Sequence, residues 1–284
     1  MSETSGFTHD SDFTALLELY VTLVQAQAGL NIPIEYAWLN DRQVLAVKLY
    51  RHLHSMRQVG AGSSLTYKGT ICSFIDHASV KVLMRAALET YLVFYFVFRV
   101  DELEVSHFRH MTWKLGGLLD RQRLHPITEA ARSTQAMELD QITQLRKEIE
   151  SHLIFGTLTK RERDKILGGE WRTGKAWHNL AVHAGFHPHY FSNIYNYLCG
   201  FSHSSYASAL QVGQAKEIEK QRELSESMFS VACMVAAHFS FTYASLFDLA
   251  QQALDSNPTA KKIAEKWRFK AEDMDRIYKE GGKG

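Results

Sequence analysis

Prolines are rare in this chain, with four among 284 residues. Proline removes a backbone donor and interrupts helices, so its scarcity lets a helical period continue over long stretches. Apolar residues recur at intervals of three and four, as in Phe13, Leu16, Leu17, Tyr20 and Leu23, which is the pattern of an amphipathic helix. The sequence shows no alternating strand pattern bounded by turn dipeptides. It therefore predicts an all-α protein, a single large bundle of about six to nine helices.

The same period places the expected helices along the chain. They cover approximately residues 13–24, 35–58, 68–98, 101–124, 128–152, 189–200, 214–254 and 259–279, with a turn or two of helix over 159–169. The helix over about 68–98 is apolar almost all round from residue 80, which predicts a place at the centre of the bundle. Residues 214–254 are expected to form one long helix or two joined end to end, and they make up the long C-terminal helix pair.

Charge is balanced over the whole chain but not along it. The net charge is +1, which excludes a globally basic nucleic-acid binder. Six acidic residues precede the first basic residue, Arg42, whereas the last 28 residues hold eight Lys or Arg against five acids. Opposite charges at the two ends could meet within one molecule or between two copies, so a homo-oligomer is one candidate assembly. We expect an acidic helical segment over 1–30, a helical core domain over 31–256, and a basic C-terminal helix and tail over 257–284.

One stretch is long enough to cross a bilayer. Residues 228–247 carry no formally charged side chain, and about 20 such residues suffice for a span. Hydroxyl and imidazole side chains within the stretch weaken its apolar character, and no basic cluster flanks it. A buried helix fits these features better than an anchor does. We therefore expect no integral membrane span.

The cysteines and the first residues indicate a cellular compartment. Cys72, Cys199 and Cys233 lie far apart in apolar stretches, and no CxxC pair occurs, which is typical of a protein in a reducing environment. The N-terminus is polar and acidic and lacks the apolar core of a signal peptide. A cytoplasmic location is therefore expected.

Arg85 and Glu89 are the only charged residues between Lys81 and Arg99 in the apolar 68–98 helix. Their spacing of four places them on one helix face. A buried charge must be paired and hydrogen-bonded, or it costs several kcal/mol. Two interpretations follow: a buried ion pair that fixes helix register, or the polar floor of a pocket.

A second candidate segment spans residues 195–203. On a helix, Tyr195, Cys199 and His203 fall on one slowly drifting stripe. A Cys–His pair at this spacing is one way to build an activated thiolate, although a cysteine in an apolar stretch is usually buried and inert. Gly200 is also expected as a helix end before His203. His203 is the better candidate for a proton donor or acceptor near neutral pH.

Histidines also gather between residues 178 and 189. His183 and His187 have the spacing of two ligands on one helix face, but Gly185 and Pro188 disturb that geometry. No HExxH pattern accompanies them. We therefore expect no metal or other cofactor, and a metal-dependent hydrolase that uses His178, His183 or His187 stands as a further alternative.

The segments RAALETYL (85–92) and YNYLCGFSH (195–203) are similar to an uncharacterised bacterial family, domain of unknown function 5677, over approximately residues 65–250. Arg85 and Glu89 match its Arg–x–x–x–Glu element, and Tyr195, Leu198 and His203 match its second element. Cys199 stands where that family has a serine. The resemblance implies an all-helical fold with a polar cluster of Arg85, Glu89, Tyr195 and His203, and it implies no established activity.

The chain also resembles, more weakly, the HEPN helical domains, many of which are similar to metal-independent ribonucleases of defence and toxin systems. Their Arg-to-His spacing occurs here at Arg146–His152 and Arg172–His178, about as often as chance predicts. Two functions remain open beside the metal hydrolase. One is a non-catalytic module that binds a partner or ligand. The other is a HEPN-like defence or toxin protein that acts on RNA or nucleotides, with His203, Glu89, Arg85 and Tyr195 as the catalytic residues.

Overall fold

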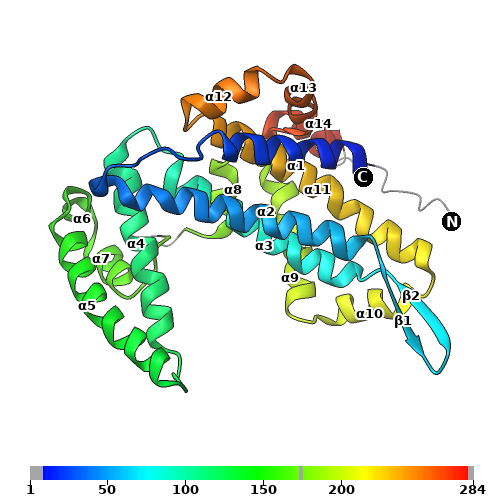
Figure 1. Ribbon diagram of the computed structural model, residues 1–284, viewed down its shortest axis with the longest axis horizontal. Helices are drawn as coiled ribbons and strands as arrows, with labels where there is room; N and C mark the ends of the chain where they lie inside the picture. The colour runs from blue at the N-terminus through cyan, green and yellow to red at the C-terminus, as the bar shows by residue number, and fades with distance from the viewer. Residues whose placement is uncertain (1–8, 173–174, 281–284) are drawn as a thin grey trace. The chain divides into compact units, whose positions relative to one another are not determined.

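The computed structural model describes residues 9–172 and 175–280. It is 76% helical, with 14 α-helices and one small two-stranded sheet in the described part (Figure 1). The prediction of an all-α protein is confirmed. The helices are more numerous than the six to nine expected, because turns divide several of the long helical patterns. The tail expected beyond residue 280 lies outside the described residues.

The helices pack into two compact units rather than the single bundle that we expected. Unit 1 comprises Met1–Phe94 and Ala181–Gly284, and unit 2 comprises Tyr95–Leu180. The predicted division into 1–30, 31–256 and 257–284 stays a prediction.

Unit 1 is built from both ends of the chain. Its first part holds α1 (Asp10–Gln25), the 3₁₀ helix η1 (Ile34–Asn40), α2 (Asp41–Gly60), β1 (Ser63–Tyr67), β2 (Thr70–Phe74) and most of α3 (His77–Phe98). Its second part holds the end of α8 (Trp177–His183), then α9 (Pro188–Ser202), α10 (Tyr206–Gln214), α11 (Ile218–Ala244), α12 (Asp248–Asp255), α13 (Pro258–Trp267) and α14 (Ala271–Glu280). The patterns over 214–254 and 259–279 are thus each divided between two or more helices.

Helix α11 lies in the core of unit 1. It contacts α1, α2, α12 and α13, and Tyr20 of α1 stacks on its Phe239 with ring centroids 4.2 Å apart. The helix is long and apolar enough to cross a membrane, but 83% of its most apolar segment is buried inside the protein. Its all-round apolar surface therefore reflects burial among other helices, in line with the expectation of no integral membrane span.

The acidic and basic ends of the chain meet within the molecule. A carboxylate oxygen of Asp12 accepts hydrogen bonds from Lys266 Nζ at 2.6 Å and Trp267 Nε1 at 2.8 Å. These two hydrogen bonds lower the pKa of Asp12. Trp267 itself is buried, so α13 packs onto α1 by apolar contact as well as by charge.

A β-hairpin occupies residues that we expected to be a flexible break and the start of a helix. Tyr67 of β1 pairs with Thr70 of β2, and both Lys68 and Gly69 between them have positive φ angles, 48° and 78°. Two such residues form the tight turn that joins twisted antiparallel strands. All ten strand residues are exposed. The strands therefore have no buried face, and the sequence shows no alternation of apolar and polar side chains there. Helix α3 consequently begins at His77 rather than near residue 68.

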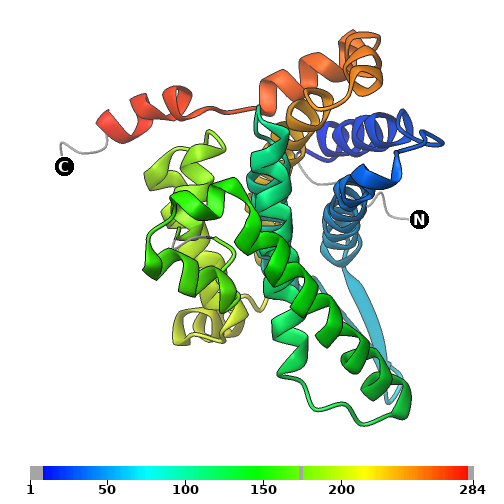
Figure 2. The same cartoon turned by 90° about the vertical axis from the view of Figure 1, so that its left-hand side faces the viewer.

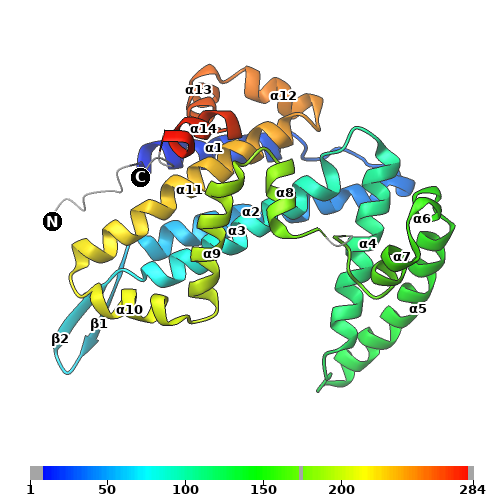
Figure 3. The same ribbon diagram turned by 180° about the vertical axis from the view of Figure 1, so that it is seen from behind.

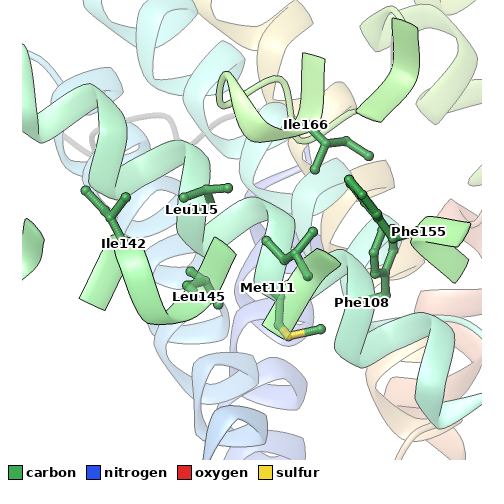
Figure 4. Packing of buried hydrophobic residues seen from close by; sticks show 8 residues of the cluster. Phe108, Met111, Leu115, Ile142, Leu145, Phe155 and Ile166 are labelled. Atoms are coloured by element: carbon green, nitrogen blue, oxygen red, sulfur yellow. The ribbon is translucent and has the colours of Figure 1, made fainter. Parts of the chain in front are cut away.

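Unit 2 is formed around the antiparallel pair α4 (Leu103–Gln122) and α5 (Glu129–Ser151), which Figure 2 shows side by side, with α6 (Leu153–Thr157) and α7 (Lys160–Leu167). Thr159 and Glu162 form a capping box that starts α7. Figure 4 shows the core of this unit, where apolar side chains of all four helices converge: Phe108, Met111, Leu115, Ile142, Leu145, Phe155 and Ile166.

Candidate functional site

Arg85 and Glu89 form an ion pair on the surface of α3. Arg85 Nε donates to Glu89 Oε1 at 3.0 Å, and the two side chains are 20% and 27% exposed. Each therefore retains access to solvent, although most of its area is covered. The pair is not sealed in the core, so it is available as the polar floor of a site as well as a lock on helix register.

Tyr195 joins α9 to this pair. Its hydroxyl donates to the same oxygen, Glu89 Oε1, at 2.7 Å. Figure 3 shows the ribbon of α9 crossing that of α3. The Arg85 guanidinium lies 5.5 Å from the Tyr195 ring centroid, and the buried Phe191 stacks on that ring at 5.3 Å. Burial, and then the hydrogen bond to Glu89, raises the pKa of Tyr195. The phenol therefore stays a neutral donor at physiological pH.

His203 completes the cluster at its solvent-exposed edge. Its Nε2 lies 3.2 Å from Arg85 Nη1, and the residue itself is exposed. An arginine nitrogen can only donate, so this contact is a hydrogen bond when His203 Nε2 carries no proton. Protonation of the ring would place two cations side by side, which an anion between them would stabilise.

The end of α9 differs from the prediction in a way that places His203. We expected Gly200 to end the helix, but α9 continues to Ser202. A Cβ at residue 200 would lie 3.0 Å from Ser205 Oγ, so glycine here permits a close approach within the turn. The chain then turns at Ser204, whose φ of 50° is uncommon for a residue with a side chain. The strained backbone conformation therefore lies at the residue directly after His203.

The contacts of Arg85 with Glu89 and Tyr195 raise its pKa and orient its guanidinium. Burial lowers the pKa of Arg85, but the hydrogen bond with Tyr195 and the charge of Glu89 outweigh it, so that pKa is raised. Glu89 Oε1 accepts from both Arg85 and Tyr195, which orients the guanidinium with Nη1 toward His203. The result is a pre-oriented cation beside an imidazole, an arrangement that can bind an anion or transfer a proton next to one.

Cys199 lies one turn before His203 on α9 but is not joined to it through its thiol. The residue is half-buried and carries a free thiol. In the described residues that thiol makes no hydrogen bond to the His203 ring. The activated Cys–His pair that the spacing allows is therefore not formed in this structure.

Lys81 is a neighbour of the cluster that the sequence pattern did not single out. It lies one turn before Arg85 on α3 and is completely buried. Its Nζ contacts His77 Nδ1 at 3.0 Å and donates to the Leu224 carbonyl at 3.2 Å, and it lies 4.6 Å from the Phe201 ring centroid. Burial lowers the pKa of Lys81 to about 8. Its position four residues before Arg85 on the same apolar helix was the signal available in the sequence.

The histidine-rich segment has structural roles in the described chain. His187 Nδ1 accepts from the Tyr190 backbone N–H at 3.4 Å and so caps α9, and its Nε2 lies 3.4 Å from Asp275 Oδ1. Its ring stacks on Tyr278 at 4.5 Å. Within residues 9–172 and 175–280, no group of three or more His, Cys, Asp or Glu side chains could hold a metal ion. The structure thus does not bring His178, His183 and His187 together as a ligand set.

Comparison with known proteins gives one match. The model of a family of unknown function (DUF5677) matches residues 47–221, more than half of the chain. This range includes all four residues of the cluster. No curated protein and no solved structure matches the chain.

Proposed function

The chain belongs to the family of unknown function DUF5677, and from the geometry around Arg85 we propose that it is a helical binding module whose site recognises a phosphate-bearing ligand such as a nucleotide. The observation that carries this proposal is the 3.2 Å approach of Arg85 Nη1 to His203 Nε2 at the exposed edge of the cluster. The ordering of Arg85 by Glu89 and Tyr195 supports it, because a donor that is already oriented loses little entropy on binding.

The chemistry of the two side chains favours phosphate. A guanidinium presents several N–H donors in a fixed plane, which suits phosphate oxygens. The imidazole of His203 adds a second polar group at the same exposed edge. A cytoplasmic location, where nucleotides and RNA are abundant, is part of the proposal, and the free thiols of Cys72, Cys199 and Cys233 are compatible with it.

Calorimetric titration with ATP as the probe tests this proposal. We expect saturable binding that weakens about tenfold in Arg85→Lys, because a lysine lacks the planar fork. His203→Ala should also weaken binding, because it removes the polar group that lies 3.2 Å from Arg85 Nη1. His189→Gln, at an exposed histidine of the same helix, is the matched control and should change nothing. Equal affinity in all four proteins would contradict the proposal.

A second candidate is metal-independent cleavage of RNA by a HEPN-like protein. It is favoured by one observation, the exposed imidazole of His203 beside Arg85. Histidine could transfer a proton while arginine stabilises charge that develops on the phosphate. A labelled single-stranded RNA incubated with and without chelator, with wild type and His203→Ala, separates this activity from binding. Intact RNA under all conditions would reject cleavage and leave the binding proposal in place.

A partner surface on the basic C-terminal helix is less well supported. Ala260, Ala264 and Trp267 of α13 are buried in unit 1, and Lys266 is paired with Asp12. Truncation at Asn257 would therefore remove part of the core together with any docking surface. Single substitutions at exposed positions are the appropriate test of partner binding.

A further inference from the structure

Unit 2 contains a pocket with a largely apolar wall. Its volume is about 250 Å³, and aromatic side chains of three segments line it: Phe96, Phe108 and Trp171. Phe96 and Trp171 lie with ring centroids 5.8 Å apart. A cavity of about 150 Å³ holds a benzene molecule, so this pocket has room for one or two fused rings.

Two cations enter the same pocket. The Arg109 guanidinium lies 4.4 Å from the Phe96 ring centroid, and Lys175 Nζ lies 5.7 Å from it. Arg109 Nη1 also donates to the Phe96 carbonyl at 2.8 Å, which fixes the guanidinium against the wall. Lys175 is exposed at the rim. The remaining donors of both side chains are available to a molecule in the pocket.

No carboxylate balances these charges. The residues that line the pocket include no Asp or Glu, and in the described part of the chain neither Arg109 nor Lys175 has an ion-pair partner. Burial lowers the pKa of Arg109, and burial followed by the charge of Arg109 lowers the pKa of Lys175. Both cations therefore gain if an anion enters, because it offsets their burial and their mutual repulsion.

A close approach of the backbone positions Trp171. A Cβ on Gly116 of α4 would lie 2.7 Å from the Gly169 carbonyl oxygen and 3.0 Å from Trp171 Cδ1. Gly169 itself has a φ of 99°, in the region that favours glycine. Two glycines thus allow the 169–171 segment to pack directly on α4. The packing of unit 2 therefore fixes the position of the aromatic wall.

We propose that this pocket binds a small amphiphilic anion, with a flat aromatic body against Phe96 and Trp171 and a compact anionic head group at Arg109 and Lys175. Apolar walls with a few convergent polar groups are typical of small-molecule sites. The aromatic rings would hold the body by offset or edge contacts, and the head group would accept charge-assisted hydrogen bonds. This site is formed entirely by residues of unit 2 and does not depend on the function proposed for the Arg85 cluster.

Titration with naphthalene-2-carboxylate and with its neutral carboxamide tests the proposal. The carboxylate should bind saturably and at least about tenfold more tightly than the carboxamide, because only the carboxylate forms charge-assisted hydrogen bonds. Calorimetry measures the affinity, and tryptophan fluorescence reports contact with Trp171. In Trp171→Phe most of the fluorescence change should disappear while calorimetric binding persists. 2-Naphthyl phosphate, titrated in parallel, shows which head group the two cations prefer.

Two lysine substitutions that each remove one positive charge show where the carboxylate binds. Lys175→Gln should weaken carboxylate binding about fivefold, whereas Lys147→Gln, at an exposed position of α5 outside the pocket, should not. Absence of saturable carboxylate binding, equal affinity for carboxylate and carboxamide, or equal effects of the two lysine substitutions would each overturn the proposal. So would carboxylate binding that is lost in His203→Ala but retained in Lys175→Gln, because it would place the anion at the Arg85 cluster.

Discussion

Arg85 in unit 1 and Arg109 in unit 2 make similar contacts with different electrostatic consequences. Each guanidinium lies over an aromatic ring, 5.5 Å from Tyr195 or 4.4 Å from Phe96. Arg85 also pairs with Glu89, and its pKa is raised. Arg109 has no carboxylate partner among the described residues, and burial lowers its pKa.

The difference shows that stacking alone does not define the role of an arginine. A neighbouring carboxylate compensates and orients the charge, as Glu89 does for Arg85. Without one, the charge stays uncompensated and favours an external anion. The two regions should therefore respond differently to acid, to loss of the arginine and to changes in packing.

Acid should affect the core of unit 1 most strongly. His238 of α11 is 4% exposed, and burial lowers its pKa to about 4, although the hydrogen bond to the Phe269 carbonyl opposes this. Above pH 6.5, the ordinary value, the histidine is neutral in both states. As the pH falls toward 4, the unfolded chain binds the proton first, so the free energy of unfolding should fall by about 3 kcal/mol.

Hydrogen exchange resolved by mass spectrometry measures this loss for α11 and α4 separately. His238→Gln keeps a donor for the Phe269 carbonyl but cannot protonate, so it should restore protection of α11 in acid without changing that of α4. The exposed His189→Gln is the control. If His238→Gln protects α4 as much as α11, the two regions open together and the comparison between them fails.

The same substitution at the two arginines should have unequal effects on stability. Arg85→Met leaves Glu89 mostly covered without its cation, so we expect the free energy of unfolding to fall by about 2 kcal/mol. Arg109→Met removes an uncompensated charge but also the hydrogen bond to the Phe96 carbonyl, so the net change should stay within about 1 kcal/mol. Urea denaturation of each protein measures both values.

A double-mutant cycle sharpens this comparison. Replacing Glu89 by leucine in the Arg85→Met protein removes the unpaired carboxylate, and stability should recover by more than half. Arg109→Met could instead lower the free energy of unfolding as much as Arg85→Met does. The charge of Arg109 would then be balanced by a group that is not among the described residues. That result would also weaken the case for an anion at the pocket.

Closer packing at Gly116 should lower stability less than the loss of Arg85 does. Gly116→Ala forces the Gly169 carbonyl or α4 to shift, so we expect unfolding to become easier by about 1.5 kcal/mol. Gly117→Ala, where a Cβ meets nothing within 4 Å, should instead stabilise the helix by about 0.5 kcal/mol. Thermal unfolding compares them, and a blue or red shift of tryptophan emission reports movement of Trp171. Equal melting temperatures would show that the 169–171 segment adapts without cost.

Much of the secondary structure could be predicted because it follows from local periodicity. The amphipathic patterns of α1, α2 and α4 predicted those helices, and Pro188 and Pro258 open α9 and α13 as expected of proline in a first helical turn. The hairpin of β1 and β2 could not be found in this way. Its residues are exposed on both faces, so no alternation of apolar and polar side chains marks it.

The candidate site was predictable only in its parts. The spacing of Arg85 and Glu89 predicts one helix face, and the ion pair forms there. The approach of His203 to Arg85 joins residues 118 positions apart and depends on α9 continuing through Gly200. The local sequence indicated the opposite, since glycine commonly ends a helix.

By itself, the sequence determined the all-α class and the positions of the charged and aromatic side chains on individual helices, because both depend on a period of 3.6 residues. Only the tertiary structure decided which of those side chains meet. Glu89 found a donor on α9, and Arg109 and Lys175 met over Phe96 without a carboxylate. Such meetings depend on how closely helices and loops approach, as at Gly116 and Gly169, and local periodicity carries no information about that distance.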